Sequence, residues 1–315
     1  MYRRGMIYIM NGLEGVNTKS QTFLEKGDSL QLIKKIPNEV CHLILSDIPY
    51  GIGYDEWDVL HNNTNSSYMG ASEAQKQSGE VFKHRGKPLN GWSKADKEIS
   101  KEYYEWCCKW AIEWLRVLKP GASVFIFAGR RMAHRCICAM EDAGFLFKDM
   151  LSWEKESAFH RAQRVSVIYE KRGDVENAEK WKGWRLGNLR PLFEPILWFM
   201  KPYPIGGTLA DNIKDYEVGA YNDLEWKKVS SSSSNLIKVT SDKEDHGLHP
   251  TQKPVSLLES LIKLVTTEGQ IVVDPFMGSG STGVACRNLN RRFIGFEYNE
   301  DYFLKAKERL GAKEK

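Results

Sequence analysis

Residues 271–297 constrain the fold of this 315-residue chain more than any other part of the sequence. The apolar residues 271–273 predict a buried parallel strand, and Asp274 follows them. A turn with two glycines, a helix-compatible stretch and a second apolar run come next, and this run ends at Glu297. Such an order is typical of a nucleotide site at the carboxyl edge of a parallel sheet, where an acid binds ribose hydroxyls. The full dinucleotide fingerprint is missing, which favours a nucleoside ligand; the alternative is a turn that only packs a helix on a strand.

A second segment, Asp47, Ile48, Pro49 and Tyr50, carries side chains suited to chemistry on a nucleobase amine. Such an amine is a poor nucleophile because its lone pair is delocalised into the ring. The Asp47 carboxylate and the Ile48 carbonyl, restrained by Pro49, would accept both amine hydrogens and localise the lone pair. Tyr50 offers a flat surface on which an extruded base can stack. The alternative is a strand-ending turn in which the aspartate only caps the backbone.

Composition predicts a globular protein that does not enter a membrane. Hydrophobic residues make up 42% of the chain and charged residues 27%, which is enough for a core. No apolar run approaches the ~18 residues that a membrane span needs. The six cysteines form no Cys-x-x-Cys pair, so we expect reduced thiols, no metal site and a cytoplasmic location. A formal charge of +4 permits an anionic partner without requiring one.

Alternating apolar and amphipathic runs predict an α/β fold. We expect strands near residues 21–25, 40–45, 122–128, 145–153, 194–200, 271–273 and 292–296, and helices near 30–36, 101–118, 132–143, 255–266, 282–289 and 300–310. Residues from about 55 to 100 are predicted to form a mobile loop, and 201–247 an irregular insertion rather than sheet.

Two polar segments carry basic side chains together with tryptophan, a combination that suits a nucleic acid strand. One lies within the expected loop and the other between residues 154 and 191. The alternative is a solvated surface without a partner. The basic residues that we select as nucleic acid contacts are Lys83, Arg85, Lys87, Arg161, Arg164 and Arg185.

Taken together, these motifs resemble those of the amino-group DNA methyltransferases that depend on S-adenosylmethionine. The family's Asp-Pro-Pro-Tyr motif is matched by residues 47–50, and its cofactor motif is similar to residues 274–281. Its His-Pro-Thr-Gln-Lys-Pro box is found at residues 249–254, and Gly27-Asp28 and Phe193-Glu194-Pro195 match shorter motifs. Because the catalytic motif precedes the cofactor motif, the chain resembles the β class. That class implies a Rossmann-like methyltransferase sheet, mostly parallel, with helices on both faces, circularly permuted and carrying inserted DNA-recognition segments.

The resemblance also implies a role for individual residues. Asp28 would accept from the adenine amine of S-adenosylmethionine, Glu297 would hold the ribose, and Lys253 would approach the methionine carboxylate. Ile48 departs from the family pattern, but only its backbone carbonyl is needed, so we expect activity. The implied catalytic residues are Asp47, Ile48, Pro49 and Tyr50, and the implied cofactor-binding residues are Asp28, Thr251, Lys253, Asp274, Pro275, Phe276, Gly278, Ser279, Gly280, Ser281 and Glu297.

The target that the resemblance implies is N6 of a flipped adenine in duplex DNA, because the motif starts with aspartate. Cytosine N4 is the main alternative, and a catalytically inactive DNA-binding relative and a methyltransferase for protein or RNA amides are others. The sequence has no Pro-Cys dipeptide to supply a thiol nucleophile, which argues against attack at cytosine C5. We divide the chain into a catalytic part (1–154), an inserted DNA-contacting part with one strand (155–248) and a cofactor part (249–315). A homodimer and a cognate restriction endonuclease are further expected partners.

Overall fold

The computed structural model describes residues 22–50, 94–155, 162–239 and 252–311. Their centre is one eight-stranded sheet in the order β1-β10-β9-β2-β3-β7-β4-β8. The strands, in sheet order, are β1 (Thr22–Lys26), β10 (Arg292–Glu297), β9 (Ile271–Asp274), β2 (Cys41–Asp47), β3 (Leu118–Phe127), β7 (Phe193–Met200), β4 (Leu146–Glu154) and β8 (Leu236–Lys238).

Strand β7 is antiparallel to both of its neighbours, β3 and β4, while the other neighbouring strands run parallel. The expected mostly parallel sheet is therefore confirmed. Strand β9, late in the chain, pairs with β2, early in the chain, through Leu43 opposite Val272 and Ile44 opposite Val273. Parallel strands end at the same edge of a sheet, so this pairing brings Asp47 and Asp274 together.

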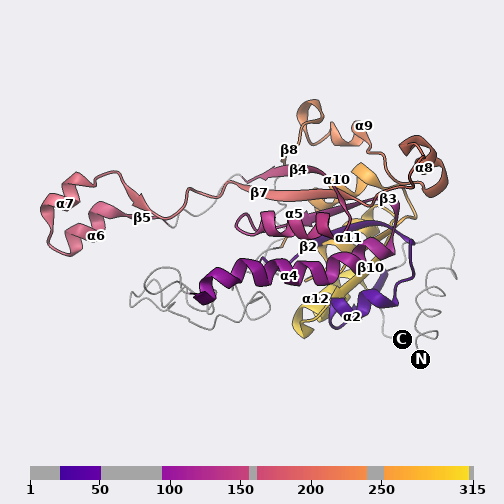
Figure 1. Cartoon of the computed structure of the whole chain (residues 1–315), viewed down its shortest axis with the longest axis horizontal. Coiled ribbons are helices and arrows are strands. Elements are labelled where there is room, and N and C mark those ends of the chain that lie inside the picture. Colours follow the sequence, from indigo (N-terminus) through magenta and orange to yellow (C-terminus); the bar gives the residue numbers. More distant parts are fainter. Residues whose placement is uncertain (1–21, 51–93, 156–161, 240–251, 312–315) are drawn as a thin grey trace.

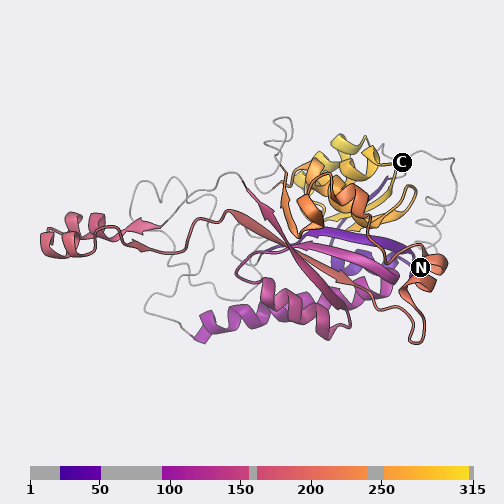
Figure 2. The ribbon, with the colours of Figure 1, turned by 90° about the horizontal axis from the view of Figure 1, so that it is seen from above.

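Helices cover both faces of the sheet, as expected. The side chains of β2 alternate between two cores, with Ile44 in one and Leu43 and Leu45 in the other. The first core lies under α2, α4 and α5, and the second under α10, α11 and α12, on opposite sides of the sheet in Figure 2. These helices are α2 (Ser29–Leu32), which a 3-10 turn (Ile33–Lys35) continues, α4 (Lys94–Val117), α5 (Ala133–Asp142), α10 (Val255–Val265), α11 (Ser281–Asn288) and α12 (Glu300–Leu310).

A small subdomain extends from the sheet between β4 and β7, and we call it the arm (Figures 1 and 2). It contains a two-stranded antiparallel ribbon, β5 (Gln163–Arg164) and β6 (Arg185–Leu186), and two short helices, α6 (Val165–Lys171) and α7 (Val175–Lys180). Most of its side chains are exposed or only half-buried, so it adds little to the two cores.

The structure differs from the sequence-based expectations at the start of β3, which is Leu118 rather than residue 122, at the start of α4 and in the region 201–247. Helix α4 starts at Lys94, so residues 94–100 belong to a helix rather than to the expected loop; Ile99 packs against the core and favours this extension. The region 201–247, expected to be irregular, holds α8 (Leu209–Tyr216), α9 (Asp223–Trp226) and the sheet strand β8. Strand β8 has three residues, of which Ile237 is fully buried, and this is too short for an alternating pattern to be recognised. No helix in the described ranges has the length and apolarity to cross a membrane.

Candidate active site

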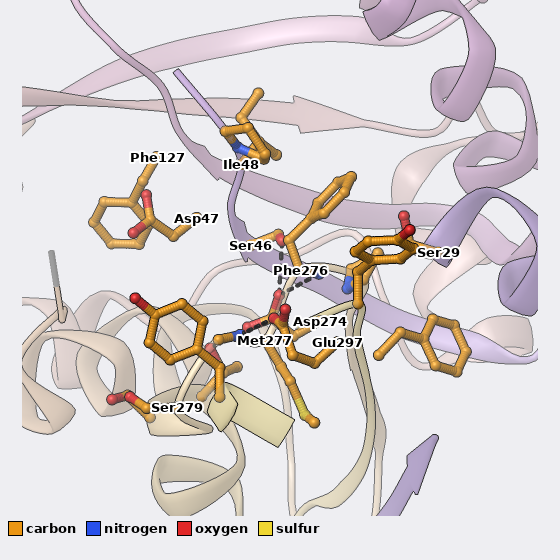
Figure 3. Close-up of a pocket in the computed structure, with 18 of the residues that line it drawn as sticks. Ser29, Ser46, Asp47, Ile48, Phe127, Asp274, Phe276, Met277, Ser279 and Glu297 are labelled. Atoms are coloured by element: carbon orange, nitrogen blue, oxygen red, sulfur yellow. Dashed lines mark hydrogen bonds between the residues drawn. The ribbon is translucent and has the colours of Figure 1, made fainter. Parts of the chain in front are cut away.

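A cavity of about 290 Å³ opens at the carboxyl ends of β2, β9 and β10 (Figure 3). Ligands of open α/β sheets bind outside this edge, because the loops that leave the strands diverge there. The residues that line it include Gly27, Asp28, Ser29, Asp47, Ile48, Pro49, Tyr50, Phe127, Gln252, Lys253, Asp274, Pro275, Phe276, Gly278, Ser279, Ser281, Glu297, Tyr298 and Tyr302.

Asp274 organises the loop that follows β9. One of its carboxylate oxygens accepts from the Ser46 hydroxyl at 2.7 Å and the Phe276 amide at 3.2 Å, and the other accepts from the Thr282 hydroxyl at 2.6 Å (Figure 3). Burial raises the pKa of the carboxyl to about 7, although these three donors oppose the rise. Asp274 therefore ties β9 to β2 and to the start of α11, and shapes the cavity wall.

Two glycines allow the loop to turn next to the cavity. Gly278 and Gly280 have φ values of +52° and +82°, a region that side chains other than glycine rarely adopt. A Cβ at Gly280 would also lie 3.0 Å from the Cβ of Ala306, whereas a Cβ at Gly278 would meet no atom within 4 Å. Gly280 is thus required for packing against α12, and the open space beside Gly278 leaves room for a ligand.

Glu297 faces this loop from the end of β10. Its two oxygens accept from the Gly278 amide at 2.9 Å and the Asn299 amide at 2.7 Å. Burial raises the pKa of Glu297, although the backbone donors oppose this. Each carboxylate oxygen has two lone pairs, so Glu297 can still accept from a pair of ribose hydroxyls. Asp28 lines the same wall, because the Gly27 amide donates to the Glu297 carbonyl at 2.8 Å.

Asp47 ends β2 and belongs to a buried cluster of charges. The Lys253 ammonium lies 2.6 Å from one oxygen of Asp47, 3.0 Å from a Glu194 oxygen and 3.1 Å from the Tyr50 hydroxyl. Tyr50 donates to the same Glu194 oxygen, and Lys155 pairs with the other Glu194 oxygen. Two carboxylates and two ammonium groups thus balance each other in this part of the site.

The environment shifts the pKa values within this cluster. Burial raises the pKa of Asp47, and the Lys253 charge only partly compensates for it. Burial also acts on Glu194, but Lys253 and Lys155 together outweigh it and hold its pKa at about 2. The pKa of Lys253 is raised, because the attraction of Asp47 and Glu194 exceeds the effect of burial. Lys253 is therefore a cation whose charge is shared by two carboxylates.

Some buried polar atoms of the cavity wall have no partner. The second oxygen of Asp47, Oδ1, and both carboxamide atoms of Gln252 form no hydrogen bond with any described residue. An unsatisfied buried polar atom costs about 1–3 kcal/mol, so a bound molecule that hydrogen-bonds these atoms would recover that energy. Together with the Glu297 lone pairs and the space at Gly278, they fit a nucleoside-containing cofactor beside a hydrogen-bond donor.

The turn after Asp47 is held from several sides. The Ile48 side chain is 1% exposed and is part of the core, and the Tyr103 hydroxyl donates to the Pro49 carbonyl at 3.1 Å. Gly129, which follows β3, lies directly against the Tyr50 side chain. These contacts immobilise the turn although isoleucine replaces the first proline of the family pattern.

Most residues selected from the sequence meet in this cavity. The exceptions fall into three groups. Gly280 does not line it and instead packs against α12. Arg164 and Arg185 lie on the arm, opposite each other in its ribbon. Lys83, Arg85, Lys87, Arg161, Thr251 and most of the expected loop at 55–100 fall outside the described residues.

Sequence reasoning missed the role of Glu194, Lys155 and Ser46 in this site. In the sequence, Glu194 is identified only as part of the Phe-Glu-Pro motif. A glutamate at the start of an apolar strand nevertheless indicates a buried carboxylate that is paired with a cation, because buried glutamates need partners. Lys155 lies in the basic segment between residues 154 and 191, and nothing local in the sequence separates it from the other basic residues there. Ser46 precedes Asp47 on a strand whose side chains alternate, and it therefore points toward Asp274 rather than toward Lys253.

A nucleoside cofactor on the β9–β10 side of the cavity and an amine at Asp47 would be held within one continuous space. This geometry, on a mostly parallel sheet with one antiparallel strand, defines an amino-group methyltransferase that uses S-adenosylmethionine. Comparison with known proteins agrees. The chain belongs to the N6/N4 family of DNA methylases, whose model matches residues 41–308. The enzyme acts on DNA and its cofactor is S-adenosylmethionine.

The chain is 56% identical over 289 residues to the type II methyltransferase M.HindIII of Haemophilus influenzae, covering 90% of this chain and 93% of that protein. It is 28% identical to M2.DpnII of Streptococcus pneumoniae, covering 93% and 91%. Among solved structures, the cytosine-N4-specific PvuII DNA methyltransferase is similar in fold, with a TM-score of 0.60 and 18% identity over 93% of this chain and 87% of that chain. The M1.HpyAVI–S-adenosylmethionine complex has a TM-score of 0.52 and 23% identity over 92% and 98%.

Proposed function

We propose that the enzyme methylates N6 of an adenine in duplex DNA, and that Asp47, Ile48, Pro49 and Tyr50 perform the reaction. The observation that carries this proposal is the Asp47 Oδ1 atom, which lines the cofactor cavity and accepts no hydrogen bond from the part of the chain that the structure describes. The aspartate at the start of the motif favours adenine. Cytosine N4 is the second candidate, because a cytosine-N4-specific enzyme shares the fold and cytosine presents an equivalent amine.

The proposed mechanism relies on positioning rather than on covalent catalysis. The base leaves the duplex at a cost of a few kcal/mol and stacks on Tyr50. Asp47 Oδ1 and the Ile48 carbonyl accept the two amine hydrogens, so that the nitrogen lone pair points away from the ring plane. When bound, S-adenosylmethionine would supply an electrophilic methyl group to this lone pair and would leave as S-adenosylhomocysteine, and the methylated nitrogen would then lose one proton to water. As the nitrogen becomes cationic, the Asp47 carboxylate stabilises the developing charge.

The cofactor residues are assigned in the same proposal. Glu297 binds the ribose hydroxyls with its remaining lone pairs, and Asp28 accepts from the adenine amine of the cofactor. Gly278 lets the backbone approach it, and Phe276 and Ser279 form its wall. Lys253 is assigned to the methionine carboxylate, and its ammonium also contacts Asp47 and Glu194. The other assigned residues are Thr251, Asp274, Pro275, Gly280 and Ser281, of which Asp274 and Gly280 act by shaping the loop.

DNA contacts are assigned to the inserted segments. The arm contributes Arg164 and Arg185 on adjacent strands, where both can reach one phosphate backbone. Lys83, Arg85, Lys87 and Arg161 complete the set. We also propose a cytoplasmic location, a homodimer and a cognate restriction endonuclease, since the relatives are type II methyltransferases of bacteria.

The test is to incubate the enzyme with methyl-labelled S-adenosylmethionine and unmethylated DNA, and to identify the labelled nucleoside after digestion. We expect N6-methyldeoxyadenosine. Label in N4-methyldeoxycytidine would agree with the proposed mechanism but would show that the target base is cytosine rather than adenine. Label that resists nuclease and is lost to protease would show a protein substrate instead of DNA.

A further inference from the structure

Glu194 contacts three members of the charge cluster, yet it lies outside the Asp-Ile-Pro-Tyr motif and outside the cofactor loops. Its side chain is 10% exposed, and three groups contact its carboxylate: Lys253 at 3.0 Å, Lys155 and the Tyr50 hydroxyl. A buried carboxylate with this many donors is held in one orientation. Two of these donors, Lys253 and Tyr50, also contact each other, and Lys253 contacts Asp47 as well.

The Asp47 and Glu194 carboxylates share one cation, so the charge of Glu194 affects where Lys253 lies relative to Asp47. The Lys253 ammonium lies between the two carboxylates, 2.6 Å from Asp47 and 3.0 Å from Glu194. If Glu194 were neutral, the ammonium would be attracted by Asp47 alone and could bridge both of its oxygens. The Asp47 oxygen that has no partner among the described residues, Oδ1, would then be occupied by Lys253 and closed to a substrate amine.

We propose that Glu194 is a positioning residue for methyl transfer: it draws Lys253 away from Asp47 Oδ1 and fixes the Tyr50 hydroxyl, so that one oxygen and one ring stay available to the target base. This inference rests on the proposed roles of Asp47 and Tyr50. Glu194 touches neither base nor cofactor in this scheme and acts only through Lys253 and Tyr50.

The position of Glu194 also connects the site to the arm. Glu194 opens β7 just after the arm, opposite Trp153 of β4, and its partner Lys155 follows β4 just before the arm. The two ends of the inserted segment are therefore joined by a partly buried ion pair that reaches Asp47 through Lys253. A change at Lys155 should for this reason alter catalysis less than a change at Glu194, since Lys155 touches only the far oxygen.

The first experiment compares the variant Glu194→Gln with the wild type in single-turnover methylation across pH. Glutamine keeps the size and an acceptor for Tyr50 but loses the charge that holds Lys253. We expect the rate constant to fall at least 10-fold. The charged and titratable groups facing Asp47 are Lys253, Glu194, Tyr50 and Asp274. Because the Glu194 charge raises the pKa of Asp47, its loss should also move the acid limb of the rate profile to lower pH.

Loss of one buried partner can destabilise a protein, so a second variant separates folding from positioning. The double variant Glu194→Gln/Lys155→Gln restores the balance of charge and is expected to recover thermal stability while its rate and pH profile stay like those of Glu194→Gln. The matched control is Glu154→Gln, which breaks the Glu154–Lys238 pair at 2.9 Å on the neighbouring strand and should leave the rate unchanged.

Three outcomes decide the matter. A wild-type rate and acid limb in Glu194→Gln would overturn the inference and leave the proposed function intact. Recovery of the rate in the double variant would also overturn it, because Glu194 would then serve only to neutralise Lys155. Absence of nucleobase methylation by the wild-type enzyme would instead refute the proposed function before any variant is compared.

Discussion

Gly129 offers a sharp test of whether Tyr50 must lie where the structure places it. The residue follows β3, and a Cβ added to it would lie 2.9 Å from Tyr50 Cβ and 3.0 Å from Cγ. Carbon atoms in ordinary contact are about 3.5–4.0 Å apart. The φ of Gly129 is outside the left-handed region, so alanine fits the backbone, and the three atoms nearest to the added Cβ all belong to the Tyr50 side chain.

The distances set the size of the expected effect. In Gly129→Ala the tyrosine must move by about 0.5–1 Å to restore a normal contact, and such overpacking costs about 1–3 kcal/mol of stability. A displacement of about 1 Å near the reacting atoms can lower a rate about 100-fold. We therefore expect the single-turnover rate constant to fall between about 10-fold and 100-fold. Cofactor affinity should stay close to that of the wild type, because Gly129 does not line the cavity.

The assay is single-turnover methylation of a DNA duplex, with the cofactor Kd measured separately by calorimetry. Gly207→Ala is the matched control, since Gly207 also avoids positive φ and its added Cβ would meet only the Pro204 carbonyl at 3.5 Å. A folded Gly129→Ala protein with the wild-type single-turnover rate constant would refute the reasoning, because Tyr50 would then tolerate displacement. A variant that loses only cofactor affinity would also contradict the reasoning, because Tyr50 would then contact the cofactor rather than the target base.

Four further predictions follow from the site. Asp47→Asn should lower kcat about 100- to 1,000-fold with cofactor Kd unchanged, and full turnover would remove Asp47 from the mechanism. Glu297→Gln should raise the cofactor Kd about 10-fold, measured by calorimetry, and an unchanged value would contradict ribose binding. The pKa of Asp274 is about 7 in the folded protein, above its ordinary value of 3.8, so the folded state retains the proton and the free energy of unfolding falls as the pH rises between these two values. Asp274→Asn should flatten this pH dependence, measured by urea unfolding. A pH dependence parallel to that of the wild type would contradict the prediction. Arg164→Ala and Arg185→Ala should each reduce the salt dependence of DNA binding by about one unit of slope, and an unchanged slope would exclude a phosphate contact.

Local sequence patterns predicted most of the secondary structure around the site. The strands at β2, β9 and β10 were located within two residues, because continuous apolar runs of that length form buried parallel strands. The turn at Gly278 and Gly280 was recognised because positive φ values are favoured only by glycine. In contrast, β8 and the first turns of α4 were missed, since a three-residue strand and a polar helix start carry no clear periodicity.

The charge cluster could not be predicted in the same way. Lys253 was assigned to the cofactor carboxylate, but in the structure its ammonium contacts Asp47, Glu194 and Tyr50. The assignment to the cofactor stays a prediction, and the contacts add a role for Lys253 beside the base. Lys155 lies in a basic stretch that from the sequence resembles a solvated surface, and only its pairing with Glu194 distinguishes it.

The sequence by itself determined the chemical groups and the local shapes: an aspartate at the end of one strand, a glycine turn after another, and an acid at the end of a third. Those features depend on neighbouring residues and on backbone conformation, which short segments encode. The tertiary structure decided which of these groups meet. It alone brought Ser46 to Asp274, 228 residues later, and Lys253 to Asp47, 206 residues earlier. Contacts of this range depend on the order and direction of the strands in the whole sheet, which no local pattern contains.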